Sequence, residues 1–431
     1  MNYYSLNHIA PNTTFENAVI KGLAPDRGLY FPETITALDP SFFETIETLS
    51  NEEIAYEAIK QFISPEIPEA ILKTIVSETL SFEFPVVKLT DSISTLELFH
   101  GPTMAFKDVG ARFMARCLGH FNKNNSNEVT VLVATSGDTG GAVANGFLGV
   151  KGVRVVILYP SGKVSDIQEK QLTTLGQNIT ALEVEGTFDD CQDMVKKAFL
   201  DTDLTSKMQL TSANSINVAR WLPQLFYFMF AYKQLKNKYK DIVFSVPSGN
   251  FGNVCAGMIA QKLGLPIKHF IASNNDNNVV TRYLKSADYE PKPSVQTVSN
   301  AMDVGNPSNF IRIQAIYNND FETLKSNLSS YSFSDIETKE ALDEIYTTTG
   351  YIADPHGAVG YLGCKSYLMT NSEAHCVFLE TAHPTKFLDV VKEVVAVDIP
   401  LPKQIKAVID KVKVATQIND YSEFKAFLTE L

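Results

Sequence analysis

Paired cysteines, long apolar runs and an excess of basic charge are all missing from this sequence of 431 residues. The 5 cysteines contain no CxxC pair, and such an odd, dispersed set favours reduced thiols in an intracellular, cytoplasmic protein. The first twenty residues contain no basic segment followed by an apolar one, so no signal peptide is expected. No run of about eighteen apolar residues exists, and no membrane span is predicted.

The charge balance is acidic, since 37 Lys and Arg face 49 Asp and Glu for a formal net charge of −12. A nucleic-acid or anionic-membrane surface is therefore not predicted, because phosphate backbones require a basic patch. The length predicts two or three domains, with a core large enough to need neither disulfides nor a structural metal. Cys117, Cys255 and Cys376 lie in apolar runs and are interpreted as small core residues.

The sequence pattern divides the chain into three parts. Residues 1–85 are predicted to form an N-terminal helical domain, because segments such as EEIAYEAIKQFI space apolar residues by three and four. A turn-rich loop, GLAPDRGLYFPE, interrupts this domain. Residues 86–390 are predicted to form two α/β lobes, with the small lobe at about 125–215. Residues 391–431 are predicted to be a C-terminal helical segment that packs on the large lobe.

Apolar strands alternate with helical patterns from about residue 127. VTVLVAT, VRVVILYP and DIVFSVP each precede a polar turn, and a capping box of Ser165 and Gln168 predicts the start of one of the helices. Continuous apolar strands in this alternation predict an α/β fold with mostly parallel sheets flanked by helices. Ligands of such folds bind at the carboxyl ends of the strands, so the polar turns are the candidate sites.

The first candidate turn is HGPTMAFKD, which contains Lys107 between the apolar residues Phe106 and Val109. Partial desolvation lowers the pKa of a lysine amine, and an imine-forming lysine requires a lowered pKa. The alternative is an ordinary solvated lysine. The motif by itself leaves both interpretations open.

Two further turns carry small and hydroxyl residues where a strand meets a helix. In TSGDTGG, hydroxyl groups and free amides predict an anion site, and the alternative is a helix cap made by Asp138. In PSGNFGN, two glycines permit positive φ, so that successive amides can form a cradle for a phosphate. Neither turn matches GxGxxG or GxxxxGK[ST], so a dinucleotide site or a P-loop is not supported.

A fourth segment, TSANSINVARW, offers an amide, a hydroxyl and a guanidinium for binding an oxyanion. The alternative is a polar loop that ends in a helix cap at Asn217. The fifth segment, ETAHPTKF, places Thr381 at the end of a strand. His383 and His356 are both interpreted as structural hydrogen-bonding residues, with His356 at the border of the cleft.

Together, HGPTMAFKD, TSGDTG, SANSIN, SVPSGNFGN, NAMDVGNP and ETAHPTKF resemble, in this order, the threonine synthase family of fold type II pyridoxal-phosphate (PLP) enzymes. The resemblance covers essentially the whole chain. It implies that Lys107 is the catalytic lysine and binds PLP as a Schiff base. The other cofactor contacts that it implies are Gly249, Asn250, Phe251 and Asn253 at the phosphate, Thr381 at the pyridine nitrogen, and Asp138, which contacts the ring or only caps a helix.

For the substrate, the resemblance implies one set of residues at a carboxylate and another at a phosphate. The carboxylate set is Ser136, Gly137 and Thr139. The phosphate set is Asn214, Ser215, Arg220 and Lys163. The implied activity is a lyase of threonine biosynthesis that eliminates phosphate from O-phospho-L-homoserine and adds water, in a monomer or homodimer. No metal is implied.

Two alternative functions stay open at this point. A serine or threonine dehydratase of the same fold would use the lysine and the cofactor loop, but it has no need of the second anion-binding set. A non-catalytic binding protein on this scaffold is expected to lack the lysine or the phosphate loop, and this sequence contains both.

Overall fold

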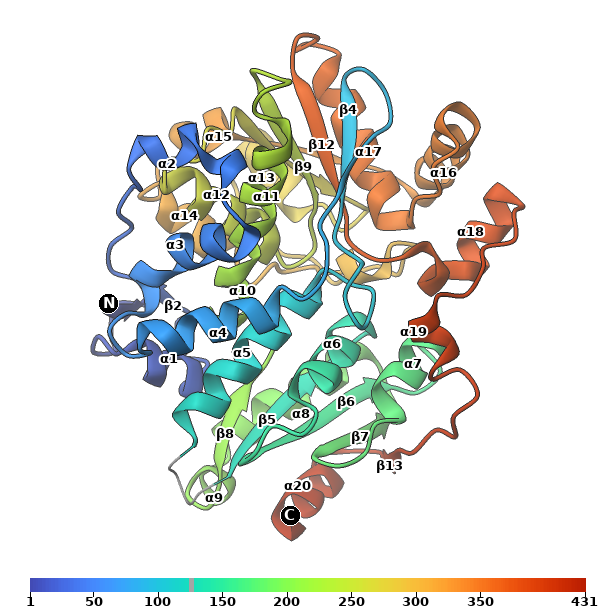
Figure 1. Ribbon diagram of the computed structural model, residues 1–431. Coiled ribbons are helices and arrows are strands. Elements are labelled where there is room, and N and C mark those ends of the chain that lie inside the picture. Colours follow the sequence, from blue (N-terminus) through green and yellow to red (C-terminus); the bar gives the residue numbers. More distant parts are fainter. Residues whose placement is uncertain (124–127) are drawn as a thin grey trace.

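The computed structural model describes residues 1–123 and 128–431. Two β-sheets with helices packed on them form the body of the molecule, and a mainly helical N-terminal unit lies beside them (Figure 1). The predicted α/β class, with mostly parallel sheets flanked by helices, is confirmed. The predicted start of the small lobe, at about residue 125, lies outside the described residues.

The larger sheet has six strands in the order β11-β10-β9-β12-β4-β3. Only its edge strand β3 is antiparallel to its neighbour. The carboxyl ends of β9, β12 and β4 therefore lie along the same edge of the sheet. The strands are β3 (Val86–Lys88), β4 (Ile93–Glu97), β9 (Ile242–Pro247), β10 (His269–Asn274), β11 (Leu328–Ser332) and β12 (His375–Glu380).

The smaller sheet has five parallel strands in the order β13-β7-β6-β5-β8. Every residue of β5 is buried, and all but one of β6, as their continuous apolar sequences predict for a sheet covered on both faces. The strands are β5 (Val129–Ala134), β6 (Val153–Pro160), β7 (Ile179–Val184), β8 (Gln209–Ser212) and β13 (Thr416–Ile418).

Helices follow most of these strands and pack against the sheets. The predicted capping box is present at the start of α7, where Gln168 N donates to Ser165 Oγ at 3.4 Å. The helices of the two lobes are α5 (Lys107–Phe121), α6 (Asp138–Phe147), α7 (Asp166–Thr173), α8 (Phe188–Leu200), α9 (Thr202–Thr205), α10 (Val218–Trp221), α11 (Leu225–Leu235), α12 (Gly252–Lys262), α13 (Val279–Ser286), α14 (Phe310–Ile316), α15 (Phe321–Asn327), α16 (Asp335–Thr349) and α17 (Pro355–Leu368).

The N-terminal unit contains more than the predicted helices. Its first and third elements form a small antiparallel sheet, in which Tyr4 is paired with Phe31. The turn-rich loop therefore contains a strand, which the local sequence did not predict because its pairing partner lies far away along the chain. The elements are β1 (Tyr3–Ser5), α1 (Phe15–Lys21), β2 (Tyr30–Pro32), α2 (Pro40–Glu44), α3 (Asn51–Ile63) and α4 (Glu69–Thr79).

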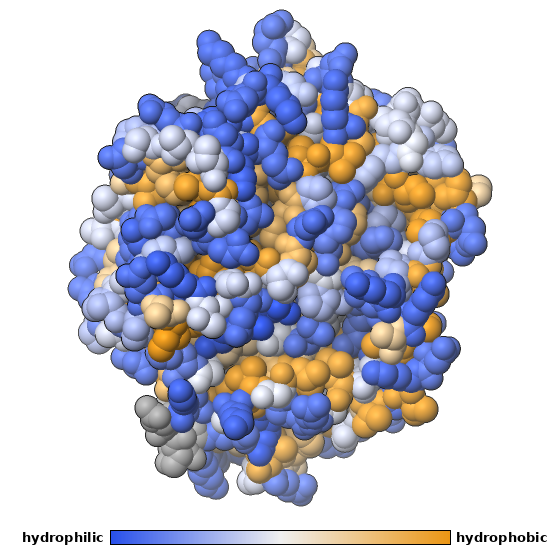
Figure 2. Space-filling model, in the orientation of Figure 1, coloured by the Kyte–Doolittle hydropathy of each residue, from blue (hydrophilic) through white to orange (hydrophobic). Residues whose placement is uncertain are grey.

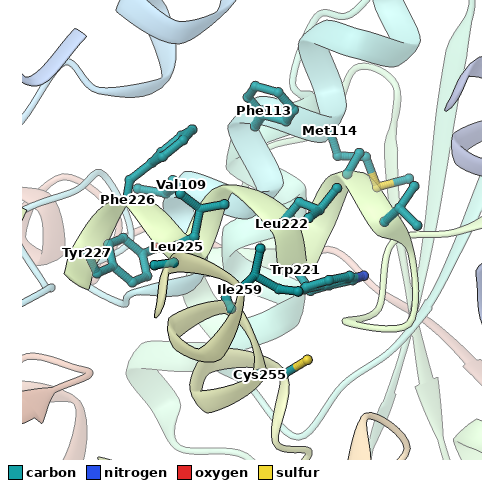
Figure 3. Packing of buried hydrophobic residues seen from close by; sticks show 14 of the residues in the cluster. Val109, Phe113, Met114, Trp221, Leu222, Leu225, Phe226, Tyr227, Cys255 and Ile259 are labelled. Atoms are coloured by element: carbon teal, nitrogen blue, oxygen red, sulfur yellow. The ribbon is translucent and has the colours of Figure 1, made fainter. Parts of the chain in front are cut away.

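The largest apolar cluster is centred on helices that are buried on nearly all sides. Trp221, the one tryptophan of the chain, is fully buried at the end of α10. In Figure 3, Trp221 and Leu222 lie close to Val109 of α5 and Ile259 of α12. This packing anchors the segment that follows β8 to the helices on either side of it.

The C-terminal segment does not pack as predicted. Helix α18 (Leu388–Val395) does contact α16, but α19 (Lys403–Lys406) leads the chain away from the large lobe. Strand β13 then pairs with β7, and α20 (Tyr421–Glu430) packs on α8, so the chain ends on the smaller sheet (Figure 1). An open sheet edge needs a cover, and β13 supplies it for β7. The prediction that residues 391–431 pack on the large lobe is therefore wrong for their last part.

The surface is mixed in polarity. On the face shown in Figure 2, hydrophilic side chains cover most of the area and are interrupted by smaller apolar regions. The three cysteines predicted to be core residues, Cys117, Cys255 and Cys376, are fully buried and unpaired. Among the helices of the described residues, none has both the length and the apolar character needed to cross a bilayer.

The C-terminal docking gives a test of stability. Phe424 on α20 is fully buried in the apolar cluster of the smaller lobe. Phe424→Ala is expected to lower the free energy of unfolding in urea by about 3–5 kcal/mol, because it opens a cavity in that cluster. Val412→Ala serves as the control, since this side chain is 81% exposed. Equal losses for the two variants would contradict the docking of α20.

Candidate active site

The carboxyl ends of strands from both sheets surround a single cavity of about 390 Å³. Strands β5 and β6 contribute from the smaller sheet, and β9 and β12 from the larger one. This is the position where parallel α/β sheets bind ligands. Predicted site residues among its lining are Lys107, Ser136, Thr139, Lys163, Asn214, Ser215, Arg220, Gly249, Asn250, Phe251, Asn253 and Thr381.

Lys107 is the first residue of α5, and the backbone around it is held from two sides. The Phe106 N–H donates to the Thr381 carbonyl at 2.8 Å, next to an antiparallel bridge between Ala105 and Ala382. The carbonyl of Lys107 accepts a hydrogen bond from Arg220 Nη1 at 3.0 Å. These contacts place the lysine and Thr381 in the same wall of the cavity.

The Lys107 amine is in the electrostatic state that imine chemistry needs. Burial lowers the pKa of Lys107 to about 8, the nearby Asp138 carboxylate opposes this shift, and the cations Lys386 and Arg220 add to it. A substantial neutral fraction therefore exists near neutral pH, and only a neutral amine attacks a carbonyl. The structure thus favours a desolvated lysine over a solvated surface charge.

The turn after β5 is organised by Thr135 and not by an aspartate cap. Thr135 Oγ1 accepts hydrogen bonds from Gly137 N at 2.9 Å and Gly140 N at 2.8 Å. Gly137 occupies the N-cap position with φ of 134°, and Asp138 is the first helical residue. The alternative that Asp138 caps the helix is therefore wrong. Of the described residues in this turn, Ser136 and Thr139 line the cavity, while Gly137 and Asp138 do not.

Asp138 instead forms a buried ion pair with Lys386, which the sequence analysis did not identify as a site residue. The Lys386 ammonium lies 2.6 Å from Asp138 Oδ1 and also donates to the Thr103 carbonyl at 2.9 Å. Burial alone would raise the pKa of Asp138, but Lys386, Lys107 and a hydrogen bond from Gln168 hold it below its usual value. The lysine of ETAHPTKF was the available signal, since it follows a predicted buried strand.

The loop Pro247–Asn253 holds its shape differently from the prediction. The residue with positive φ is Phe251, at 61°, whereas neither of the loop's two glycines has positive φ. A Cβ on Gly249 would lie 2.8 Å from Met302 Cα and 2.9 Å from the Ala301 carbonyl oxygen. The glycine is needed there for close approach of two backbones, not for a left-handed turn.

The segment after β8 caps a helix and also contributes side chains to the cavity. Asn217 caps α10 through a hydrogen bond from Ala219 N, as the alternative of a helix cap predicted. Arg220 is 2% exposed, lines the cavity together with Asn214, and donates from Nε to the Ala213 carbonyl at 2.7 Å. Burial lowers the pKa of Arg220 to about 10, so its guanidinium is charged at neutral pH.

His356 and His383, the two histidines considered in the sequence analysis, have different environments. His356 lines the cavity, with Nδ1 2.6 Å from Asp354 Oδ1 and Nε2 accepting from Ala301 N at 3.2 Å. Both of its ring nitrogens are thus engaged in structural contacts at the border of the cleft, as expected. His383 caps a short turn through Thr385 N, and burial lowers its pKa to about 4, which keeps it neutral.

Comparison with known proteins identifies the family. Residues 2–80 match the description "Threonine synthase N terminus", residues 94–379 "Pyridoxal-phosphate dependent enzyme", and residues 357–428 "Threonine synthase, C-terminal". The chain is 43% identical over 435 residues to a threonine synthase of Haemophilus influenzae, with 99% of each chain covered. The chain belongs to the threonine synthase family.

Solved structures agree with this assignment. A threonine synthase crystal structure from Escherichia coli matches with a TM-score of 0.93 at 38% identity over 100% of both chains. A PLP-bound threonine synthase from Brucella melitensis matches with a TM-score of 0.93 at 33% identity, covering 100% of this chain and 99% of that one. The expected fold type II architecture, PLP dependence and lyase class are confirmed at the level of the family.

The cavity fits a phosphate-bearing cofactor. Asn253 is 6% exposed, yet its side-chain oxygen and nitrogen lack hydrogen-bond partners in the part of the chain that the structure describes. The same holds for Asn300 Oδ1, and both residues line the cavity. Buried polar atoms are nearly always hydrogen-bonded, so these atoms require a partner from outside the chain. The amides at the start of the 11-residue helix α12 add an anion-binding end.

The charge arrangement around Lys107 predicts the pH dependence of cofactor loading. Only the neutral amine reacts with the PLP aldehyde, so the loading rate rises with pH and levels off above the Lys107 pKa of about 8. Asp138→Asn removes the carboxylate that raises this pKa and leaves the Lys386 cation without its partner, so the midpoint shifts to lower pH.

The measurement is the rate at which the PLP absorbance at about 410–420 nm grows at each pH of a series. Borohydride should abolish this absorbance. Asp166→Asn, at an exposed aspartate, is the matched control. A shift of the Asp138→Asn midpoint to higher pH would contradict the electrostatic assignment, as would an equal shift in the control.

Proposed function

We propose that this member of the threonine synthase family converts O-phospho-L-homoserine and water to L-threonine and phosphate. The observation that carries the proposal is the convergence of Lys107 with two anion-binding segments on one cavity. One segment is the cofactor loop Pro247–Asn253, and the other is the loop that contains Asn214, Ser215 and Arg220. A substrate with its own phosphate explains why one cavity contains both.

Lys107 is the residue that moves protons. When bound, PLP supplies an aldehyde for the amine and an electron sink for the carbanion at the substrate α-carbon. The Lys107 amine takes the α-proton and serves as the acid and base for the following transfers, on a backbone held by hydrogen bonds with Thr381 and Arg220. Its pKa of about 8 suits this role, since the amine gains and loses a proton easily near neutral pH.

The substrate is oriented by its two anionic ends. Ser136 and Thr139 are assigned to the carboxylate. Gly137 shapes their turn, because its amide donates to Thr135 Oγ1 and so is not free for the substrate. Asn214, Ser215, Arg220 and Lys163 are assigned to the phosphate, which leaves from the γ-carbon. Water then adds at the β-carbon. Binding both ends positions the α-carbon at Lys107, and such positioning is a large part of the catalysis.

Cofactor contacts are divided between two segments. Gly249, Asn250, Phe251 and Asn253 are assigned to the PLP phosphate, with the unpartnered side chain of Asn253 as the main support. Thr381 is assigned to the pyridine nitrogen, because it lines the cavity, has a neutral hydroxyl, and is bonded through its carbonyl to the residue before Lys107. Asp138 is assigned to electrostatic support through Lys386, since it does not itself line the cavity in the described structure.

The function is tested by phosphate release from O-phospho-L-homoserine by the PLP-loaded protein, with the amino-acid product identified. L-threonine as the product supports the proposal. Formation of an oxo acid from threonine, with no phosphate released from O-phospho-L-homoserine, would identify a dehydratase instead. A protein that stays colourless with added PLP would indicate a non-catalytic binding protein.

Lys107→Ala is expected to reduce phosphate release by at least about a thousandfold, because the covalent anchor and the proton shuttle are lost together. The assay is run with the PLP absorbance recorded in parallel, and the borohydride-sensitive band should be missing. Lys262→Ala, at an exposed lysine on α12, is the control and should retain both activity and absorbance. Substantial turnover by Lys107→Ala would remove this residue from its proposed role.

Arg220→Lys tests the substrate-phosphate assignment. The lysine keeps a positive charge but loses the planar fork, so KM for O-phospho-L-homoserine should rise on the order of tenfold or more. The PLP absorbance should stay unchanged, because Arg220 is not assigned to the cofactor. Loss of the absorbance with an unaltered KM would show that the loop serves PLP and not the substrate.

A further inference from the structure

A second buried arginine, Arg312 on α14, joins three separate segments of the chain. It is 0% exposed, and its Nη2 donates to the carbonyls of Tyr30 at 2.9 Å and Ile216 at 2.6 Å. Its Nη1 donates to Asn309 Oδ1 at 2.6 Å and to the Ser215 carbonyl at 3.3 Å. The guanidinium therefore links the N-terminal unit, the loop after β8 and the start of α14.

The charge of Arg312 has no carboxylate partner among the described residues. All of its acceptors there are neutral oxygens. Burial lowers the pKa of Arg312 to about 9, which still leaves the group charged at neutral pH. Burying an unpaired charge is costly, so a chain retains it where the geometry or the field that it creates is needed.

The indole ring of Trp221 packs against this guanidinium. Its carbon lies 4.6 Å from the centroid of Trp221, whose ring also stacks with Phe31 at 6.1 Å and 7°. Trp221 is held in the core by α5 and α12 (Figure 3). Arg312 is thus held against the residue next to Arg220, and the one tryptophan of the chain reports on its surroundings.

Arg312 also connects with the cofactor loop through its neighbour Asn309. The Asn309 N–H donates to the Asn250 carbonyl at 3.2 Å, and its side-chain amide donates to Ser215 Oγ at 3.3 Å. The Ser308 N–H donates to Asn250 Oδ1 at 2.9 Å. A Cβ on Gly252 would lie 3.4 Å from Asn309 Nδ2 and 3.5 Å from Ser215 Cβ, so the two loops are nearly in contact here.

We propose that Arg312 is a positioning residue that sets the distance between the cofactor loop, 247–253, and the substrate-phosphate loop, 211–221. The substrate named for the second loop rests on the proposed function, whereas the positioning itself does not. A guanidinium is required because one planar group donates to backbone carbonyls of two segments and to the side chain of Asn309, and also lies over an indole ring. An ammonium cannot make all of these contacts at once. The unpaired charge, close behind Ser215, also favours a dianionic substrate group.

The experiment compares Arg312→Met and Arg312→Lys with the wild-type holoenzyme. The first readout is hydrogen exchange of backbone amides in 211–221 and 247–253, with Trp221 emission recorded in parallel. The second readout is KM and kcat for O-phospho-L-homoserine, with PLP absorbance. Arg282→Met is the matched control, because Arg282 likewise donates to a backbone carbonyl, that of Glu290, but lies on α13 outside both loops.

Both Arg312 variants should show faster exchange in the two loops, altered Trp221 emission and a KM raised on the order of tenfold, with PLP still bound. Arg282→Met should match the wild type in all of these. Should Arg312→Met fail to fold, Arg312→Lys decides the outcome. Unchanged exchange in both loops overturns the proposal whatever the kinetics. A wild-type enzyme that releases no phosphate would instead reject the proposed function, and the exchange data would still decide the role of Arg312.

Discussion

The backbone hydrogen bond from Phe106 N to the carbonyl of Thr381, together with that from His383 N to the carbonyl of Met104, joins the two segments on which the site depends. It attaches the start of α5 to the end of β12, the central strand that is paired on both sides within the larger sheet. Lys107 and Thr381 thereby share one wall of the cavity. Because β12 is fixed by parallel neighbours, the lysine is carried by a rigid scaffold although it lies at a loop end.

The electrostatics of the cavity explain how a protein with net charge −12 selects an anionic ligand. Charge interactions are strong in a desolvated cleft, so the few charged groups in and around it decide its potential. Arg220 and Lys386 are buried and Lys107 is half-buried, and Asp138 balances only part of their charge. Burial, and after it the cations Lys386 and Arg220, lowers the pKa of Lys107. Under the proposed function, the same cations also attract the anionic substrate.

Two further parts of the chain connect the two lobes. The N-terminal unit contacts the loop after β8 through Arg312 and the Tyr30 carbonyl, and the C-terminal segment runs from α18 beside α16 to β13 on the smaller sheet (Figure 1). Both connections cross from one lobe to the other. Under the proposal for Arg312, a residue outside the cavity lining sets how closely the cofactor loop and the substrate-phosphate loop approach each other.

The sequence alone determined the α/β class, the buried strands and the motif positions, because apolar runs and turn residues act locally. It also pointed to Lys107, whose apolar neighbours indicate desolvation. Only the tertiary structure decided that Asp138 pairs with Lys386, that Gly249 serves close approach, and that the chain ends on the smaller sheet. These features depend on contacts between residues far apart along the chain, and no local pattern encodes which distant partner a side chain or a strand edge will meet.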